Sequence, residues 1–541
     1  MLQPVLYHAC EVGSRSMSVT SEEQYCAIDE LPPPIDPESI LYSPGLVQEQ
    51  RNGVYLLIDP LEPNWVSTNR LGSKIVRQCD GRRTMEEISA HLSREDGLTA
   101  AEVAQFVRAA VVAGIISTRP ELKPAYPGRA QAVGCGTLEE LWIYTNNSCL
   151  LRCKHCLVDG GEESTKPLST SEIERLIGEA LELGAKRVYF TGGEPFLRHD
   201  LFSLVEYVTA RAELVILTSG LLLTDENVAR LAKLGRGRLL LQVSLEGPDA
   251  LTNDAIRGPG SFVQAVEGIR RLVQGGLSPV VTTTITRLNY GKVVDTSRFL
   301  ASLGVRDHHV LWLHARGRMR GDIHALHLPQ ASVSSVMEEL RQTTRSLGIV
   351  VDNLASLKDR VRSKRGRKND LCNSCFGVLS VNVDGHAYPC AALSGAPEFD
   401  CGSIKTSTLA EIWLHSPVTN WIRENSVQKK VGCSSCFLKF FCGGGCFAQS
   451  YFDYELRTGS GCIMAPDPYC TPYKTQLSEL MWELATEGLE WRDDTRPLIY
   501  RTMDNELLSC TTDGNKVLNA AFEVGTYHCA CVLAMEAKGS A

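Results

Sequence analysis

Short apolar runs alternate with amphipathic segments across the middle of the chain. The first run, LWIY, is apolar throughout, which is typical of a short buried strand. The runs cover residues 141–144, 187–190, 214–218, 239–245, 280–285 and 309–313. Helical spacing of apolar residues fills the intervals, so residues 137–330 predict repeated strand–helix units. We therefore predict an α/β fold in which the sheet curves into a partial (β/α)6 barrel.

A smaller unit is predicted over residues 46–120, after an N-terminal extension of residues 1–45. Residues 53–60 read as a strand, residues 69–78 as a helix, and Thr84 as the cap of a second helix that runs to about His91. Thr99 caps a third helix, and residues 115–116 begin a short strand. This order of elements predicts a winged-helix-like domain.

Residues 331–370 are predicted to be a helical connector. Cysteines then gather over residues 371–475, where SVNVDGHAYPC alternates like a strand, turns at Asp384-Gly385 and returns as a hairpin. The tail, residues 476–541, starts with an amphipathic helix. Five histidines between His308 and His327 have no metal-ligand spacing, and we expect them on strands or at the surface.

Composition narrows the class of protein. The chain has 541 residues, a net charge of −8, 43% hydrophobic and 22% charged residues. This balance favours neither a nucleic-acid nor a membrane partner, and no apolar run has the length of a membrane span. The N-terminus lacks the apolar core of a signal peptide, so we predict a cytoplasmic protein. Twenty cysteines in such a compartment indicate metal ligation rather than disulfides.

One cysteine loop directly follows the first barrel strand. Cys149, Cys153 and Cys156 have C-x3-C-x2-C spacing, and thiolates are soft ligands that suit iron–sulfur clusters or zinc. A four-iron cluster takes four ligands, so three thiolates leave one metal open to a small molecule. A zinc site or three buried core cysteines are the alternatives. The second strand is followed at once by Gly192-Gly193-Glu194-Pro195, where paired glycines permit close approach of a ligand.

These two motifs resemble those of the radical S-adenosylmethionine (radical SAM) enzymes. The resemblance implies a 4Fe-4S cluster whose open iron chelates S-adenosylmethionine, with GGEP contacting the methionine amino group. It further implies reductive cleavage to a 5′-deoxyadenosyl radical that abstracts a substrate hydrogen. Ser244 and Glu246, at the end of the fourth strand, resemble the family's ribose- and carboxylate-contacting positions. No catalytic side chain beyond the cluster is assigned.

The later cysteines resemble the SPASM auxiliary-cluster extension of peptide and protein maturases, and a zinc ribbon is the alternative. The resemblance implies two further 4Fe-4S clusters. Cluster one would be held by Cys372, Cys375, Cys390 and Cys446. Cluster two would be held by Cys433, Cys436, Cys442 and either Cys462 or Cys470. Cys372 stands unusually close to Cys375 and Cys401 is a spare, so cluster one could have an open iron.

The small N-terminal unit resembles the leader-recognition domain of ribosomally made, modified peptides, which binds a leader as an added edge strand. The three resemblances together imply a maturase that modifies a precursor peptide, with a thioether crosslink favoured, and a flavodoxin or ferredoxin as electron donor. Action on a tetrapyrrole or a folded protein (sulfatase activation), and a non-catalytic electron carrier, are the alternatives. For the tail cysteines Cys529 and Cys531, beside His528, a flexible terminus is favoured over a cluster-shielding or substrate-like segment.

Overall fold

The computed structural model describes residues 34–120, 125–134, 136–162, 165–486, 495–503, 506–509 and 524–525. Its body is a ten-stranded sheet in the order β12-β11-β10-β9-β8-β7-β6-β14-β15-β16. The six predicted strands form the centre of this sheet, and all of them run parallel, which confirms the fold class. Their bounds are β6 (Glu140–Tyr144), β7 (Arg187–Thr191), β8 (Glu213–Thr218), β9 (Leu239–Ser244), β10 (Val280–Ile285) and β11 (Asp307–Trp312).

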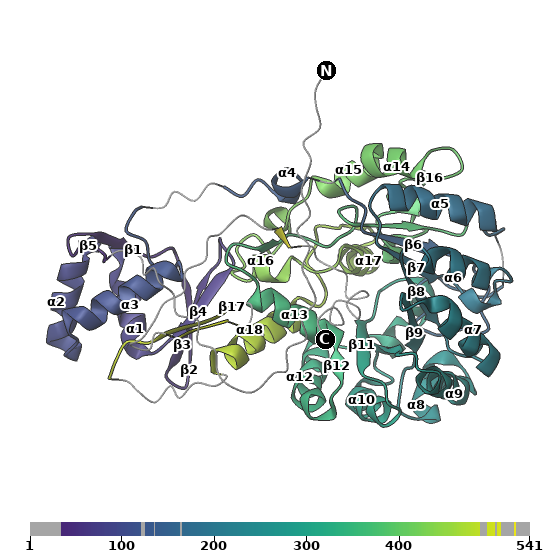
Figure 1. The fold of residues 1–541 in the computed structure, drawn as a ribbon, viewed down its shortest axis with the longest axis horizontal. Coiled ribbons are helices and arrows are strands. Elements are labelled where there is room, and N and C mark those ends of the chain that lie inside the picture. The colour runs from purple at the N-terminus through teal and green to yellow at the C-terminus, as the bar shows by residue number, and fades with distance from the viewer. Residues whose placement is uncertain are drawn as a thin grey trace, which may run out of the picture.

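Helices cover the outer face of the curved sheet, as Figure 1 shows. The first of them is capped by Ser169 and Glu172, whose side chains satisfy each other's backbone N–H groups as the sequence predicts. Their bounds are α5 (Thr170–Glu182), α6 (Leu201–Thr209), α7 (Asp225–Gly235), α8 (Ala250–Arg257), α9 (Ser261–Gln274) and α10 (Val293–Ser302).

Side chains that alternate along the strands build two apolar layers. The larger layer lies between the sheet and its helices and includes Ile143, Phe190 and Ile216. The inner layer is smaller and includes Trp142 and Tyr189, whose rings stack with centroids 4.0 Å apart. Because adjacent side chains point to opposite faces of a strand, this inner layer partly fills the barrel and leaves space above it.

Segments beyond the six units lengthen the sheet at both edges. Helix α11 (Ile323–Leu326) precedes the connector. The connector contains α12 (Gln330–Leu347), β12 (Val350–Val351) and α13 (Asp352–Arg362), and β12 pairs with β11. The predicted hairpin is β14 (Val378–Val381) and β15 (His386–Tyr388). Strand β14 pairs in parallel with β6, so the cysteine-rich region continues the barrel sheet and places its thiols beside the barrel mouth.

The N-terminal unit contains three helices and two antiparallel sheets, one formed by its first and fifth strands and one that contains the other three. Its helices are α1 (Arg70–Gln78), α2 (Met85–Asp96) and α3 (Ala100–Val112), and its strands are β1 (Ile40–Tyr42), β2 (Val47–Arg51), β3 (Val54–Asp59), β4 (Asn64–Thr68) and β5 (Asp80–Thr84). Thr84 and Thr99 cap helices as predicted. Helix α2 runs past His91 because Gly97, at φ 72°, supplies the left-handed residue that ends it. The strand expected at 115–116 is only a bridge between Ser117 and Tyr42.

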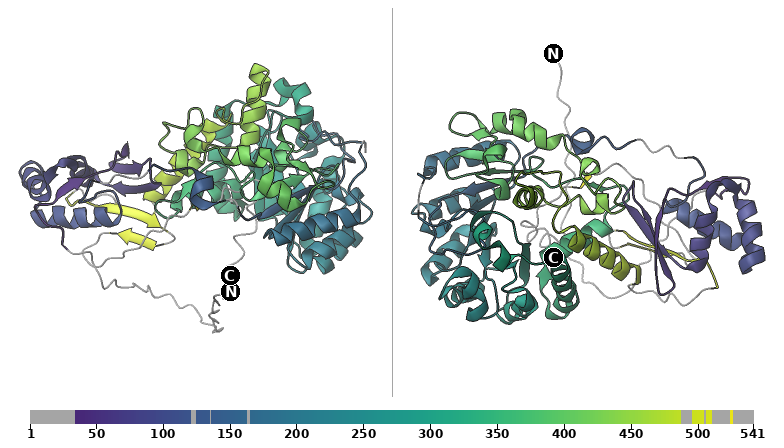
Figure 2. Two further views of the ribbon diagram at one scale, coloured as in Figure 1. Left: turned by 90° about the horizontal axis from the view of Figure 1, so that it is seen from above. Right: turned by 180° about the vertical axis from the view of Figure 1, so that it is seen from behind.

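The tail returns to this unit. Strand β17 (Ile499–Met503) pairs with β4, and β18 (Glu506–Ser509) pairs with β17, which gives a sheet in the order β18-β17-β4-β3-β2. Figure 2 shows these yellow strands beside the purple N-terminal unit, at one end of an elongated molecule. The tail helix α18 (Cys470–Thr486) begins earlier than predicted.

The remaining elements lie around the cysteines. They are α4 (Arg129–Val133), β13 (Lys368–Asn369), β16 (Gly402–Ser403), α14 (Leu409–His415), α15 (Pro417–Arg423), α16 (Lys439–Cys442), α17 (Phe447–Thr458) and β19 (Val524–Gly525). Single 3-10 turns occupy residues 195–197, 290–292, 317–322, 391–393, 397–399 and 427–429. Among the described residues, no helix is long and apolar enough to cross a membrane.

Candidate functional site

A cavity of about 280 Å³ opens at the carboxyl ends of the barrel strands. All three cysteines of the first motif line it, together with Gly192, Gly193 and Ser244. Parallel α/β sheets bind ligands at this edge, because the loops that leave the strands converge there. The structure therefore brings the predicted cluster loop, both motif glycines and Ser244 to one cavity.

The two glycines let the second-strand loop pack directly against the cysteine loop. A Cβ on Gly192 would lie 2.3 Å from the carbonyl oxygen of Asn146, and one on Gly193 would lie 2.0 Å from that of Ser148. Gly192 also has φ 128°, which favours glycine. The Gly193 N–H donates to Asn146 O at 2.8 Å. Any side chain here would push the cysteine loop out of place.

Glu194 lies behind the cavity wall rather than in it. Its side chain is fully buried and accepts hydrogen bonds from Thr218 Oγ1 at 2.7 Å and from Ser219 N at 2.9 Å. The Glu194 N–H donates to Ser148 O at 2.7 Å. Glu194 thus ties the ends of β7 and β8 to the cysteine loop. Neither it nor Pro195 is among the residues that line the cavity.

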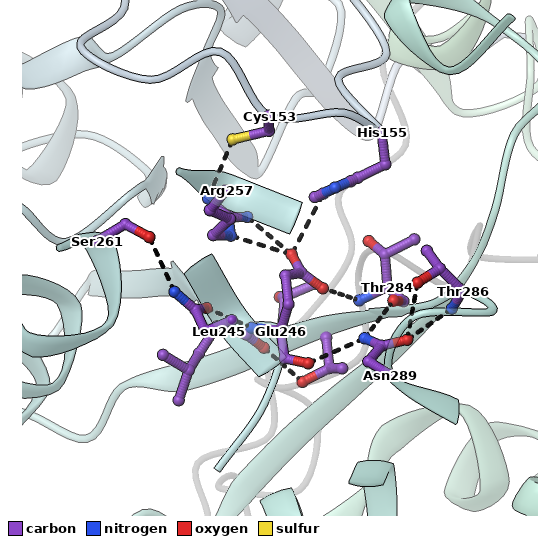
Figure 3. A network of polar contacts seen from close by, with 12 residues as sticks. Cys153, His155, Leu245, Glu246, Arg257, Ser261, Thr284, Thr286 and Asn289 are labelled. Carbon is purple, nitrogen blue, oxygen red and sulfur yellow. Dashed lines mark hydrogen bonds and ion pairs between the residues drawn. The ribbon is translucent and has the colours of Figure 1, made fainter. Parts of the chain in front are cut away.

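Glu246 is the centre of a buried ion network, which Figure 3 shows. Its carboxylate contacts Arg257 Nε and Nη2 at 3.0 Å each and His155 Nε2 at 3.2 Å, and it accepts from Thr284 N at 2.8 Å. Burial alone would raise the pKa of Glu246, but the charges of His155 and Arg257 outweigh it and lower the pKa to about 2. Glu246 is therefore ionised and, like Glu194, does not line the cavity.

Arg257 and His155 connect this network to the cluster loop. The Arg257 Nη1 atom lies 3.9 Å from Cys153 Sγ, and both Arg257 and His155 line the cavity. Sequence reasoning assigned neither residue. The position of His155 inside the cysteine motif could have indicated a role at the site. Arg257 is the last residue of α8, and no sequence motif around it indicates such a role.

Thiols of the cysteine-rich region form a first group beside the barrel mouth. Burial raises the pKa of Cys390 to about 12, and the neighbouring thiols of Cys446 and Cys372 add to the effect. Cys390 lines the cavity, and so does His314, whose Nε2 atom is 4.0 Å from Cys446 Sγ. The structure thus places one auxiliary thiol group within reach of the same cavity as the cluster loop.

Cys375 and Cys401 are neighbours in this region. Burial raises the pKa of Cys375 well above its usual value, and interaction with the Cys401 thiol is the next largest cause. Cys375 is completely buried, with φ 61°. The spare cysteine of the sequence pattern therefore accompanies Cys375, whose thiol also interacts with that of Cys390.

A second thiol group lies between α16 and α18. Burial raises the pKa of Cys433, and the thiols of Cys470 and Cys436 contribute; burial likewise raises the pKa of Cys442 to about 12, with a contribution from Cys433. Cys470 begins α18 and so joins this group, whereas Cys462 lies in the loop after α17. The structure therefore places Cys470 beside the thiols of Cys433 and Cys436.

The thiol groups fit iron–sulfur clusters better than single ions. Among the residues the structure describes, no three His, Cys, Asp or Glu side chains converge closely enough to hold one metal ion. A four-iron cluster is itself a body with ligands on several sides, so its thiols need not meet at a point. Three loop thiols facing an open cavity, with a guanidinium beside one of them, suit a cluster with a free coordination position.

Family models and known proteins that match this chain support the interpretation of the cavity as an iron–sulfur site. The family model "Radical SAM superfamily" matches residues 143–300, and the SPASM model, "Iron-sulfur cluster-binding domain", matches residues 372–437. The AdoMet-dependent heme synthase of Oleidesulfovibrio alaskensis is 30% identical over 61% of this chain and 86% of its own length. Mycofactocin maturase MftC of Mycolicibacterium smegmatis is 30% identical over 60% of this chain and 80% of its own length.

Among solved structures, Streptococcus suis SuiB bound to the precursor peptide SuiA has a similar fold. The TM-score is 0.50 with 15% identity, over 78% of this chain and 99% of that one. The fold, the cavity with its thiols and the matching family models lead to one conclusion. The chain belongs to the radical SAM superfamily, carries a SPASM domain, and is an enzyme that uses S-adenosylmethionine and 4Fe-4S clusters.

Proposed function

We propose that this enzyme modifies a ribosomally made precursor peptide. The observation that carries the proposal is the N-terminal unit, whose antiparallel sheet binds an extended segment, β17 of the tail, along β4. Pairing along a sheet edge is a general means of holding a peptide through its main chain. A further relative, the PqqA peptide cyclase of Methylocella silvestris, acts on a peptide by its name, which supports the same class of substrate.

The N-terminal unit is fixed to the body of the enzyme. Trp65 of β4 donates from Nε1 to the carbonyl of Val361 in α13 at 2.8 Å. Arg51 of β2 forms an ion pair with Glu479 of α18 at 2.7 Å. The outer face of the sheet packs on α13 and α18 through one apolar cluster. A peptide held at this unit would therefore stay at a defined distance from the cavity, which raises its effective concentration there.

The chain's own residues would prepare the cavity for hydrogen abstraction. When bound, S-adenosylmethionine and the cluster at Cys149, Cys153 and Cys156 supply the radical chemistry of this family. Gly192 and Gly193 let the two loops meet, and Ser244 faces the cavity from β9. Glu194 and Glu246 lie outside the cavity lining. Glu194 would hold the loops in position, and Glu246 would hold Arg257 in position.

We propose a thioether crosslink as the product, and an auxiliary thiol at the cavity supports this choice. Cys390 of the first auxiliary thiol group lines the same cavity as the cluster loop. Closure of a peptide Cys sulfur onto carbon removes two hydrogen atoms: one leaves in the abstraction step, and the other leaves as a proton plus an electron that auxiliary cluster one would accept. The ligands of cluster one would be Cys372, Cys375, Cys390 and Cys446. The ligands of cluster two would be Cys433, Cys436, Cys442 and Cys470. A flavodoxin or ferredoxin would supply the electron that starts the reaction.

Short peptides encoded beside this gene provide the test. Each would be incubated anaerobically with reconstituted enzyme, S-adenosylmethionine and dithionite, and examined by mass spectrometry. We expect one peptide to lose two hydrogen atoms and one of its free thiols, with 5′-deoxyadenosine formed in equal amount. The likeness to the heme synthase makes a tetrapyrrole the second candidate. Turnover of a haem precursor, with every peptide unchanged, would contradict the peptide proposal.

A further inference from the structure

The edge of β4 is already occupied by the chain's own tail. Strand β17 lies antiparallel to β4, with Ile499 opposite Thr68 and Tyr500 opposite Ser67. These residues are more than four hundred positions apart in the sequence, and the tail reaches this edge after α18, which packs against the same sheet. Figure 2 shows the same arrangement from two sides.

Thr68 and Asn69 at this edge form hydrogen bonds to backbone atoms of the tail. Asn69, just after β4, donates from Nδ2 to the carbonyl of Arg496 at 2.6 Å, and its Oδ1 accepts from the N–H of Leu498 at 3.2 Å. Thr68 Oγ1 donates to the carbonyl of Leu498. Every extended peptide offers the same carbonyl and N–H groups, so this grip suits any guest strand.

The contact between the tail and β4 is also short. Five residue pairs join β3 to β4, whereas two pairs join β17 to β4. Ile499 supplies the apolar anchor, since it is 6% exposed and packs in the core cluster of the helices α1 to α3. The other contacts that hold the tail are the hydrogen bonds of Thr68 and Asn69 and the buried ring of Tyr500. With only two ladder pairs, β17 should separate from β4 more readily than a strand within the sheet.

The tail meets the body a second time near the first auxiliary thiol group. Strand β19 pairs in parallel with β13, with Val524 opposite Lys368 and Gly525 opposite Asn369. Asn369 precedes Cys372 by three residues, and Cys529 follows Gly525 by four. A second described part of the tail, β19, therefore lies beside the strand that leads into the cysteine-rich region.

We propose that the C-terminal segment is a tethered guest strand that competes with an external peptide for the edge of β4. The proposal rests on the proposed peptide substrate, because it makes displacement of the tail a step in substrate binding. A tether of this kind gives a local concentration on the order of millimolar, so the tail would select for peptides that bind β4 tightly.

A binding experiment on the full-length chain tests this. The probe is a fluorescein-labelled peptide with the sequence of residues 494–509, DTRPLIYRTMDNELLS, and its binding is followed by fluorescence anisotropy. The double variant Ile499→Asp/Tyr500→Asp places two charges at buried positions of β17 and frees the edge. Thr495→Asp, at an exposed position of the same segment, is the control.

We expect the double variant to bind the probe at least tenfold more tightly than the wild type and the control. Equal affinity in all three chains would overturn the proposal. Hydrogen exchange of α1 to α3 distinguishes release from unfolding: if these helices lose protection in the double variant, and the probe does not restore it, β17 is an integral strand and the proposal fails. Because no turnover is measured, an inactive peptide assay would count against the proposed function alone.

Discussion

Replacing Glu246 by Gln removes the charge from a buried network while keeping the shape of the side chain. The Glu246 side chain is 1% exposed and the Arg257 side chain 9% exposed, and in the variant Arg257 would lose its carboxylate partner. A carboxyl whose pKa falls from 4.5 to about 2 on folding stabilises the folded chain by roughly 3 kcal/mol at neutral pH. Loss of one partner from a buried pair costs about the same, ~3–5 kcal/mol.

Differential scanning calorimetry of the cluster-free, reduced chain would measure this loss. For a barrel of this size, a loss of ~3 kcal/mol lowers Tm by roughly 6–12 °C. The control is Asp225→Asn, because Asp225 has a 90% exposed side chain paired with Arg271 at 3.1 Å. An exposed pair contributes about 1 kcal/mol or less, so the control should lower Tm by no more than about a third as much.

The pH dependence gives a second check on the same variant. The pKa of Glu246 is lowered in the folded chain, so its contribution is complete above the unfolded pKa of 4.5 and is lost as the pH falls toward 2. The difference between wild type and variant should therefore shrink by about half between pH 7 and roughly pH 3. A variant as stable as wild type at pH 7, or a difference that does not change with pH, would refute the electrostatic account.

Two further predictions concern the loops and the last cluster ligand. Gly193→Ala should reduce 5′-deoxyadenosine formation at least tenfold, because its Cβ would meet Ser148 O at 2.0 Å; Gly178→Ala in α5, with nothing within 4 Å, should keep full activity. A Gly193 variant with wild-type activity would contradict the packing argument. Cys470→Ala should lower bound iron and change the electron paramagnetic resonance of the reduced enzyme, whereas Cys462→Ala should do neither. The opposite pattern would assign the ligand to Cys462.

Much of the barrel could be predicted because its strands are short runs rich in apolar and β-branched residues, separated by segments with helical spacing. Arg187–Thr191 and Val280–Ile285 are found where the pattern placed them, and the paired motifs located the cavity at their carboxyl ends. Strand β4 was not predicted from the sequence, because NWVST is short and polar at both ends. All five of its residues are nevertheless buried. Its burial comes from neighbours distant in sequence, which local patterning does not record.

Contacts between residues distant in the sequence explain the other features that the sequence did not predict. The pairing of Ile499 with Thr68 depends on a chain return that no local pattern encodes, and the grouping of Arg257 with Glu246 depends on how α8 follows β9. The thiol partners also required coordinates, since spacing alone left Cys462 and Cys470 equal. The predicted roles of His528, Cys529 and Cys531 lie outside the described residues.

The central claim is that the barrel cavity holds a catalytic cluster at Cys149, Cys153 and Cys156, with two auxiliary clusters beside it. The most direct measurement compares wild type with the variant in which these three cysteines are Ala, after anaerobic reconstitution with dithionite and S-adenosylmethionine. Wild type should form 5′-deoxyadenosine and bind about twelve irons, and the variant should form none and keep about eight. Equal iron in both chains, or 5′-deoxyadenosine from the variant, would contradict the assignment of the catalytic cluster to this loop.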